Sequence, residues 1–164
     1  YSNGDSRMSI LKVDTLQPST ASTVHIAGHV IGFGYVEHST QLNVTSSSFV
    51  DSGISLSYTA KNANSKLLIH WSIPVEIYDG TANSEVRGQM QLFKDGTTVG
   101  GGIESLNTSE NVKRSGSSAT AEFSIDAGDT SAHTYSLKTK TSSDTLTVFR
   151  YGDTGSLRIL EIAQ

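Results

Sequence analysis

A run of alternating residues between positions 67 and 78 constrains the fold more than any other part of this chain. Every second position in it is apolar, namely Leu67, Ile69, Trp71, Ile73, Val75 and Ile77. Successive side chains of a β-strand point to opposite sides, so a period of two places these residues on one face. A helix would scatter them around its circumference. The run therefore predicts a long strand whose odd-numbered residues lie in the core.

Shorter strands and turns flank this run. Ile54, Leu56 and Tyr58 alternate ahead of a polar turn at 61–65, and Asp95-Gly96 between two apolar-alternating stretches is a strong hairpin signal. Short strands with a turn signal at intervals of about 8–12 residues and no helical period are typical of a sandwich or barrel. We expect an all-β fold, a jelly-roll-like antiparallel sandwich, with an immunoglobulin-like sandwich as the alternative.

Two stretches of the second half carry weaker patterns. The segment from Glu104 to Ser118 is polar and unpatterned, which predicts a loop. Near the C-terminus, Leu146 and Val148 are predicted on one strand face and Phe149 and Tyr151 on the other.

The chain has 164 residues, which fits a single domain. The pattern from Ile10 to Leu16 predicts a weak strand that stops near Pro18. We therefore divide the chain into an N-terminal linker or attachment segment with one strand, residues 1–20, and a β-sandwich (knob) domain, residues 21–164.

Composition excludes several classes of protein. The formal net charge is −4, and charged residues make up 17% of the chain, against about 25% in an average domain. A nucleic-acid binder needs a clustered basic surface, so no nucleic-acid partner is expected. The chain has no cysteine, which excludes disulfides and thiolate metal sites. No apolar run approaches the roughly 20 residues that span a bilayer, so no membrane insertion is expected.

The last predicted strand, from Leu157 to Ile162, is apolar on both faces. Leu157 and Ile159 share one face, whereas Leu160 and Ile162 share the other. An exposed strand of this kind is an aggregation hazard unless its second face is covered. Closed symmetry would cover that face without leaving an open surface for fibre growth.

Three pieces of the chain resemble a group of small β-structured virion proteins of tailed phages, common among aquatic phages, of the tail-fibre, receptor-binding-knob or decoration type. The opening Met8–Gln17 (MSILKVDTLQ) is similar to their first segment, Thr45–Gly53 followed by Ser65–Ile69 to their central pattern, and Gly155–Ile162 (GSLRILEI) to their end. The group often has Pro in the turn before the central Ser-Lys strand, where this chain has Ala60-Lys61. The resemblance implies a homotrimeric, jelly-roll-like knob, similar to tumour-necrosis-factor trimers, displayed on a virus particle.

Catalytic and metal sites are not expected. His25 and His29 lie four apart, and on a continuous strand that separation is about 13 Å, too far to share an ion through bonds of about 2.1 Å. A glycosidase needs two carboxyls roughly 5–10 Å apart, and no spacing among the acidic residues selects such a pair. Nucleophile-elbow and phosphate-loop motifs are missing as well. We therefore expect no catalytic residue, no metal and no cofactor.

Two loop regions are the candidates for ligand binding. Tyr78, Asp79 and Asn83 place an aromatic ring, a carboxylate and an amide at the end of the long predicted strand. Asn107, Asn111 and Arg114 lie in the polar segment described above. Aromatic and amide side chains in loops are typical of glycan sites, and loops carry binding residues more often than core strands do.

These observations predict a non-enzymatic virion structural protein, most simply a fibre knob that recognises host-surface glycans. A capsid decoration or cement protein is the alternative, and a capsule-degrading enzyme is a third possibility. The expected partners are two further copies of the chain, other virion proteins through the N-terminal segment, and a host-surface glycan. The expected location is the extracellular virus particle.

Overall fold

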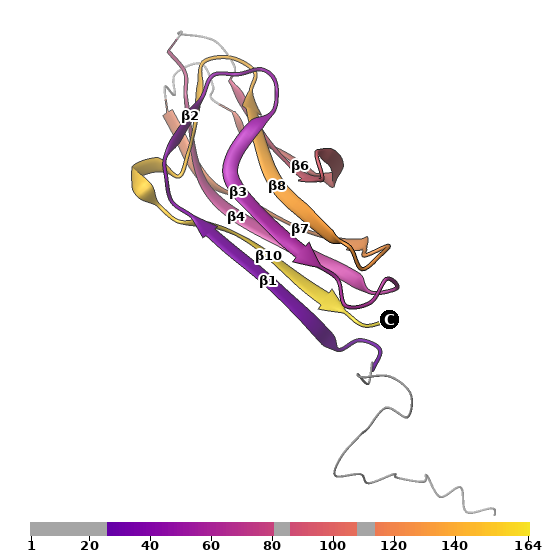
Figure 1. Cartoon of the computed structure of the whole chain (residues 1–164). Helices are drawn as coiled ribbons and strands as arrows, with labels where there is room; N and C mark the ends of the chain where they lie inside the picture. Colours follow the sequence, from indigo (N-terminus) through magenta and orange to yellow (C-terminus); the bar gives the residue numbers. More distant parts are fainter. Residues whose placement is uncertain (1–25, 81–85, 108–113) are drawn as a thin grey trace, which may run out of the picture.

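The computed structural model describes residues 26–80, 86–107 and 114–164, and only the backbone of residues 101–107. This part of the chain consists almost entirely of β-strands (Figure 1). In chain order the elements are β1 (Val30–His38), β2 (Leu42–Val44), β3 (Val50–Thr59), β4 (Lys66–Tyr78), β5 (Arg87–Lys94), β6 (Thr97–Asn107), β7 (Arg114–Asp126), β8 (Ala132–Thr141), β9 (Thr145–Val148), the short 3-10 helix η1 (Arg150–Gly152) and β10 (Gly155–Ile162). The predicted all-β class is confirmed.

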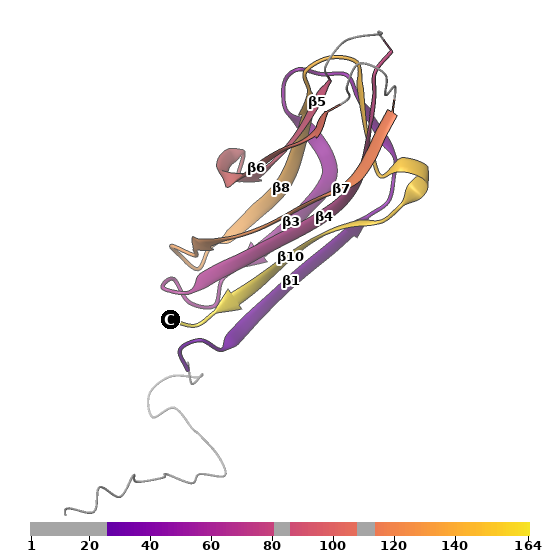
Figure 2. The same cartoon turned by 180° about the vertical axis from the view of Figure 1, so that it is seen from behind.

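The strands form two antiparallel sheets packed face to face. The first sheet has the order β1-β10-β4-β7, and the second has the order β3-β8-β5-β6. Two short strands extend the first sheet, because β9 pairs with the last residues of β4, beyond the part that pairs with β10, and β2 pairs with β9. In both views β1 and β10 run side by side along one edge of the molecule (Figures 1 and 2).

The strand order is that of a jelly roll. Most successive strands cross from one sheet to the other. The exceptions are β1–β2 and β9–β10, which stay in the first sheet, and the β5–β6 hairpin, which stays in the second. An immunoglobulin-like sandwich would instead keep more sequential strands within one sheet. The jelly-roll-like antiparallel sandwich is thus confirmed, and β3 and β4, predicted as consecutive strands, lie in opposite sheets.

The predicted register of β4 is confirmed. Its odd-numbered apolar residues face the second sheet and are buried, and Trp71 has no exposed surface. The Trp71 ring packs edge-on against Phe123 of β7, at 5.5 Å between ring centroids. Even-numbered residues of β4 therefore lie on the outer face of the first sheet.

The β5–β6 hairpin also forms as predicted. Asp95 and Gly96 have φ of 50° and 80°, the left-handed backbone that a two-residue hairpin turn of the primed type requires.

Two sequence expectations, one about a loop and one about a strand, are wrong in part. The predicted loop from Glu104 to Ser118 is shorter, because β6 extends to Asn107 and β7 already begins at Arg114. Phe149 does not lie on the face opposite Val148, because its φ of 54° turns the chain and buries its ring. The N-terminal segment, with the strand expected at Ile10–Leu16, lies outside the described residues.

The outer face of the first sheet has an apolar end and a polar end. At the apolar end Phe33 of β1, Leu160 of β10 and Leu68 of β4 stand side by side in one row across the sheet. Phe33 is 62% exposed, and Leu160 and Leu68 are half-buried. On the last strand Leu157 and Ile159 are fully buried in the core, whereas the second apolar pair expected from the sequence, Leu160 and Ile162, is half-buried on the outer face.

Candidate functional site

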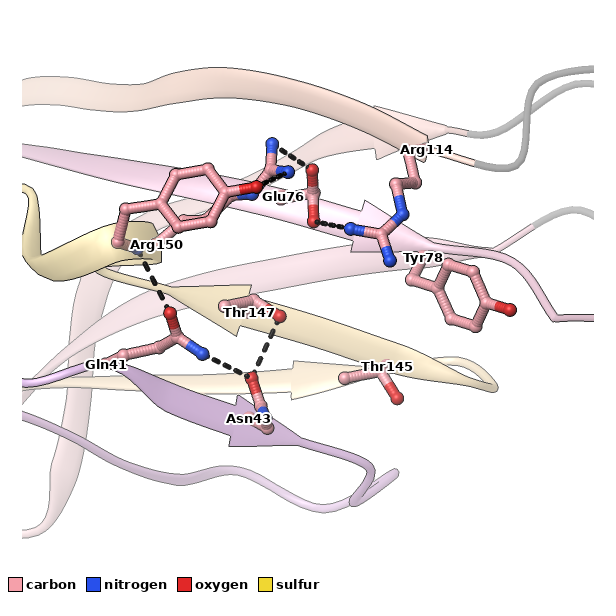
Figure 3. A pocket seen from close by; sticks show the side chains of 9 residues that line it. Gln41, Asn43, Glu76, Tyr78, Arg114, Thr145, Thr147 and Arg150 are labelled. Carbon is pink, nitrogen blue, oxygen red and sulfur yellow. Dashed lines mark hydrogen bonds and ion pairs between the residues drawn. The ribbon is translucent and has the colours of Figure 1, made fainter.

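A pocket lies on the outer face of the first sheet, at the end opposite to the apolar row. Its volume is about 260 Å³. We name it the rim pocket, and its lining consists of Gln41, Asn43, Glu76, Tyr78, Arg114, Thr145, Thr147, Arg150 and Tyr151. Figure 3 shows these side chains converging from the ends of β2, β4, β7 and β9 and from η1.

The pairing of the strands explains this convergence. In one row across the sheet, Glu76 of β4 lies between Thr147 of β9 and Gly116 of β7. In the next row Tyr78 lies between Thr145 and Arg114. From this second row the guanidinium of Arg114 reaches diagonally across to Glu76 of the first.

The carboxylate of Glu76 lies between two arginines. Its side chain is only 6% exposed, and Nη1 of Arg114 lies 3.3 Å from Oε1. Nη1 of Arg150 contacts the other oxygen, Oε2 (Figure 3). A buried carboxylate is costly without a charged partner, so the arginines both stabilise Glu76 and are held in place by it.

Each arginine also stacks on a tyrosine. The guanidinium carbon of Arg114 lies 5.1 Å from the centroid of the Tyr78 ring, and that of Arg150 lies 4.2 Å from the Tyr151 ring. Both distances fall in the range of cation–π contacts. Tyr151 is 79% exposed, so one face of its ring remains open to a ligand.

Unusual backbone conformations place Arg150 and Tyr151 at the pocket. Phe149 and Tyr151 have φ of 54° and 57°, the left-handed region that bulky residues rarely adopt. Phe149 holds the segment in place: its N–H donates to Pro74 O at 2.9 Å, and its buried ring meets the His38 ring at 5.0 Å. Strained backbone of this kind clusters at binding sites.

Amides fix the opposite wall of the rim pocket. The backbone N–H of Tyr151 donates to Oε1 of Gln41 at 3.0 Å. Nε2 of Gln41 and Oγ1 of Thr147 both donate to Oδ1 of Asn43, at 3.4 and 3.0 Å (Figure 3). Hydrogen bonds thus connect the side chains of Gln41, Asn43 and Thr147, which form this wall of the cavity.

The structure brings together two of the residues predicted for ligand binding. Tyr78 and Arg114, from separate candidate loops, stack on each other in the rim pocket. Asp79 is buried and does not line the rim pocket. Asn107 ends β6, outside the part whose side chains are described, and Asn83 and Asn111 lie outside the described residues altogether.

Sequence reasoning did not select Glu76, Arg150 or Tyr151 for ligand binding. The alternation of β4 places Glu76 on the outer face, which was a usable signal. The position of Arg150 and Tyr151 depends on the turn at Phe149, and nothing local in the sequence marks that turn.

The rim pocket offers hydrogen-bond donors, acceptors and aromatic faces around one carboxylate. Sugars are bound by this combination, because hydroxyl groups need polar partners and the flat side of the ring packs on aromatic rings. Among the described residues, no group of three or more His, Asp and Glu side chains could hold a metal ion. The same part of the chain contains no helix of the length and apolarity that crossing a bilayer requires.

Comparison with known proteins finds no matching family model and no matching curated protein. Among solved structures, the chain is similar to the VP2 subviral particle of infectious bursal disease virus, with 15% identity, a TM-score of 0.46, and coverage of 93% of this chain and 37% of that one. The Gx strain of the same virus gives 13% identity, a TM-score of 0.44, and coverage of 94% and 43%. The dimeric latent PorU of Porphyromonas gingivalis gives 10% identity, a TM-score of 0.40, and coverage of 84% and 14%.

The chain spans less than half the length of each of these structures. At such identities and scores the similarities carry no information on the chain's activity or partners.

Proposed function

We propose that this chain is a non-enzymatic structural protein of a tailed-phage particle, the knob of a fibre that binds a host-surface glycan in the rim pocket. The observation that carries the proposal is the pocket itself. Two tyrosine–arginine stacks border a polar cavity at one end of a rigid sandwich, and part of its wall is a backbone segment held in a strained conformation. Rigid scaffolds with binding residues at their ends are a common design for recognition proteins.

The phage context is supported by the sequence resemblance. Of the similar pieces, Thr45–Gly53 leads into β3, Ser65–Ile69 opens β4, and Gly155–Ile162 is β10. These pieces build neighbouring parts of the sandwich, whereas Arg150 and Tyr151 lie outside them. A scaffold built from the similar pieces, with a recognition surface outside them, fits the role of a knob.

The proposed assembly is a homotrimer. The apolar end of the first sheet exposes Val30, Phe33 and Tyr35, next to half-buried Leu160 and Ile162. An exposed apolar area of this kind is typical of a subunit interface. A polar band with Ser72, Ser118 and Thr120, which are linked by hydrogen bonds of 3.1 Å, separates it from the rim pocket. Subunit contacts at the apolar end would therefore leave the pocket open.

A purely binding role also fits the chemistry of the pocket. Its lining contains a single carboxylate, Glu76, and both carboxylate oxygens are occupied by arginines. Hydrolysis of a glycosidic bond ordinarily uses two carboxyl groups, one of them free to donate a proton.

A panel of bacterial surface polysaccharides, immobilised and probed with the purified protein, tests this function. We expect binding to a subset of the panel and no release of reducing sugar. Tyr151→Ala should weaken binding about tenfold, because it removes the stacking ring. Tyr151→Phe keeps the ring and should retain most of the affinity.

Failure to bind any glycan would contradict the knob function. Electron microscopy of labelled particles would then distinguish a capsid decoration protein from a fibre component. Release of reducing sugar, lost in Glu76→Gln, would show instead that the chain is a capsule-degrading enzyme.

A further inference from the structure

The charge of the rim pocket is opposite to that of the chain. The whole chain has a formal net charge of −4. The pocket lining has two arginines, one glutamate and no other residue charged at neutral pH, which leaves one net positive charge. A neutral ligand does not require this excess, whereas an anionic ligand would be attracted by it.

Both arginines retain donors for a ligand. A guanidinium has five N–H donors. Glu76 takes its contacts through Nη1 of each arginine, and Nη2 of Arg150 also donates to the hydroxyl of Tyr151 at 2.5 Å. The Arg114 side chain is 59% exposed and the Arg150 side chain 30% exposed. Each guanidinium therefore presents some of its N–H donors to the cavity. The planar fork of N–H donors on a guanidinium matches the two oxygens of a carboxylate or one edge of a phosphate.

The arginines are also preorganised. Stacking on Tyr78 and Tyr151 and pairing with Glu76 fix each guanidinium from two sides. A side chain that is already ordered loses little conformational entropy when it binds a ligand. This distinguishes Arg114 and Arg150 from Arg158, an exposed arginine on β10 that lies in the ladder opposite His70.

We propose that the rim pocket selects acidic saccharides, with the acid group bound by Arg114 and Arg150 and the sugar ring packed against a tyrosine. This inference rests on the glycan-binding function proposed above and specifies its ligand class. The acid group can be the carboxylate of an acidic sugar or the phosphate of a phosphorylated one, because both accept hydrogen bonds from the same fork.

Three pairs of probes test the inference by calorimetry or biolayer interferometry. They are tetragalacturonate and its carboxyl-reduced counterpart, sialyllactose and lactose, and phosphomannose and mannose. We expect at least one acidic probe to bind about tenfold or more tightly than its neutral counterpart. Added salt should weaken that binding, because a charge interaction at an open site is screened.

Variants identify the residues responsible. Arg114→Gln should lower the affinity for the acidic probe about tenfold and the affinity for any neutral sugar by a clearly smaller factor. Arg114→Lys keeps the charge but loses the fork and should recover only part of the affinity. Arg158→Gln removes the same charge about 20 Å away along the sheet, six residues from the pocket, and should have no effect.

The possible results separate the two proposals. Preference for the carboxylate probes or for the phosphate probe supports the inference and identifies the source of the acid group. Equal binding of acidic and neutral members of every pair overturns it but leaves the glycan-binding function intact. No binding to any probe or to any polysaccharide of the panel overturns both.

Discussion

Two glutamates, Glu76 on β4 and Glu161 on the neighbouring strand β10, are buried near opposite ends of β4. Their charges are stabilised in different ways. Glu76 is paired with two arginines in the rim pocket. Glu161 is fully buried opposite Leu67 and accepts hydrogen bonds from neutral donors: the hydroxyls of Tyr58 and Ser65, at 2.8 and 2.6 Å, and the backbone N–H groups of Lys61 and Asn62. Glu161 thereby joins β10 to the β3–β4 turn.

Glu161→Gln should destabilise the protein at neutral pH and much less in acid. Burial raises the pKa of Glu161, but the hydrogen bonds from Ser65, Lys61 N–H, Tyr58 and Asn62 N–H together lower it below its ordinary value of 4.5. A lowered folded-state pKa adds stability above pH 4.5 that is lost as the pH falls through the folded pKa. We expect a cost of about 1–3 kcal/mol at pH 7, measured by urea unfolding.

The cost of Glu161→Gln should shrink progressively below pH 4.5. Asp126→Asn is the matched control, because Asp126 forms an exposed pair with Lys66 at 2.6 Å and should change stability little. A cost for Glu161→Gln that is the same at pH 3 and pH 7 would show that packing rather than charge accounts for it.

His133 should add stability that disappears at alkaline pH. Its Nδ1 lies 2.6 Å from Asp95 in the β5–β6 turn, and its Nε2 lies 3.0 Å from Asp129 in the β7–β8 turn. Hydrogen bonds to Asp95 and then Asp129 raise the pKa of His133 above its ordinary 6.5, against the opposing effects of slight burial and of Lys94. The stabilisation is complete below pH 6.5 and is lost as the pH rises through the raised pKa.

Thermal unfolding of wild type and His133→Asn between pH 5 and pH 9 checks this. The difference in melting temperature should be largest below pH 6.5 and should decrease above it. A difference in melting temperature that grows with pH would contradict the stabilising interaction of charged His133 with Asp95 and Asp129.

At the scale of elements, the break between β9 and β10 determines the rim pocket. Both strands pair with the same edge of β4, and residues 149–154 turn the chain out of the sheet between them. The turn is anchored where the Phe149 ring packs closely against Gly155.

Gly155→Ala should therefore damage both stability and binding. A Cβ at this position would lie 2.6 Å from the Phe149 ring and 3.3 Å from Ile73 Cα, with no free space around it. Overpacking of this kind costs about 1–3 kcal/mol, and displacement of Phe149 would shift Arg150. Chemical unfolding and glycan affinity measure the two effects.

Gly116→Ala serves as the comparison for Gly155→Ala. A Cβ at Gly116 would have an ordinary contact of 3.7 Å with Val75 O, so its effect on stability should be small. Gly155→Ala with wild-type stability and affinity would show that Phe149 does not hold the pocket in place.

The sequence predicted strand β4 well and the turn between β9 and β10 poorly, and both outcomes have physical reasons. The alternation from Leu67 to Ile77 is a local pattern set by burial on one side, so it can be read directly. The turn at Phe149 depends on Pro74 O and His38, which are distant in sequence, and the local alternation from Leu146 to Tyr151 suggested an ordinary strand. The rim pocket could be predicted only as far as Tyr78 and Arg114 for the same reason.

At the scale of the whole molecule, the sandwich class followed from strand spacing, but the pairing of strands did not. β1 and β10 are nearly at opposite ends of the described chain and pair along their length. Such pairings depend on the complementarity of distant segments. The jelly-roll order among the possible sandwiches was therefore a choice that only the structure could confirm.

Leu160→Asp tests the proposed trimer. It places a charge in the apolar row between Phe33 and Leu68, where a neighbouring subunit would bury it. We expect sedimentation to show trimers for wild type and monomers for the variant, with the β-sheet signal in circular dichroism retained. Thr120→Asp adds the same charge on the same face, within the polar band, and should remain trimeric.

Wild-type protein that sediments as a stable monomer at micromolar concentration would contradict the trimer.

The turn between β9 and β10 has a further consequence for how such a protein can change over generations. Residues 150–154 belong to no strand, and of the turn only Phe149 is part of the core. Substitutions at Arg150 or Tyr151 would thus alter the rim pocket while the ladders of both sheets stay intact. Under the proposed knob function, a lineage could acquire a new host through this short segment alone, with the sandwich inherited unchanged.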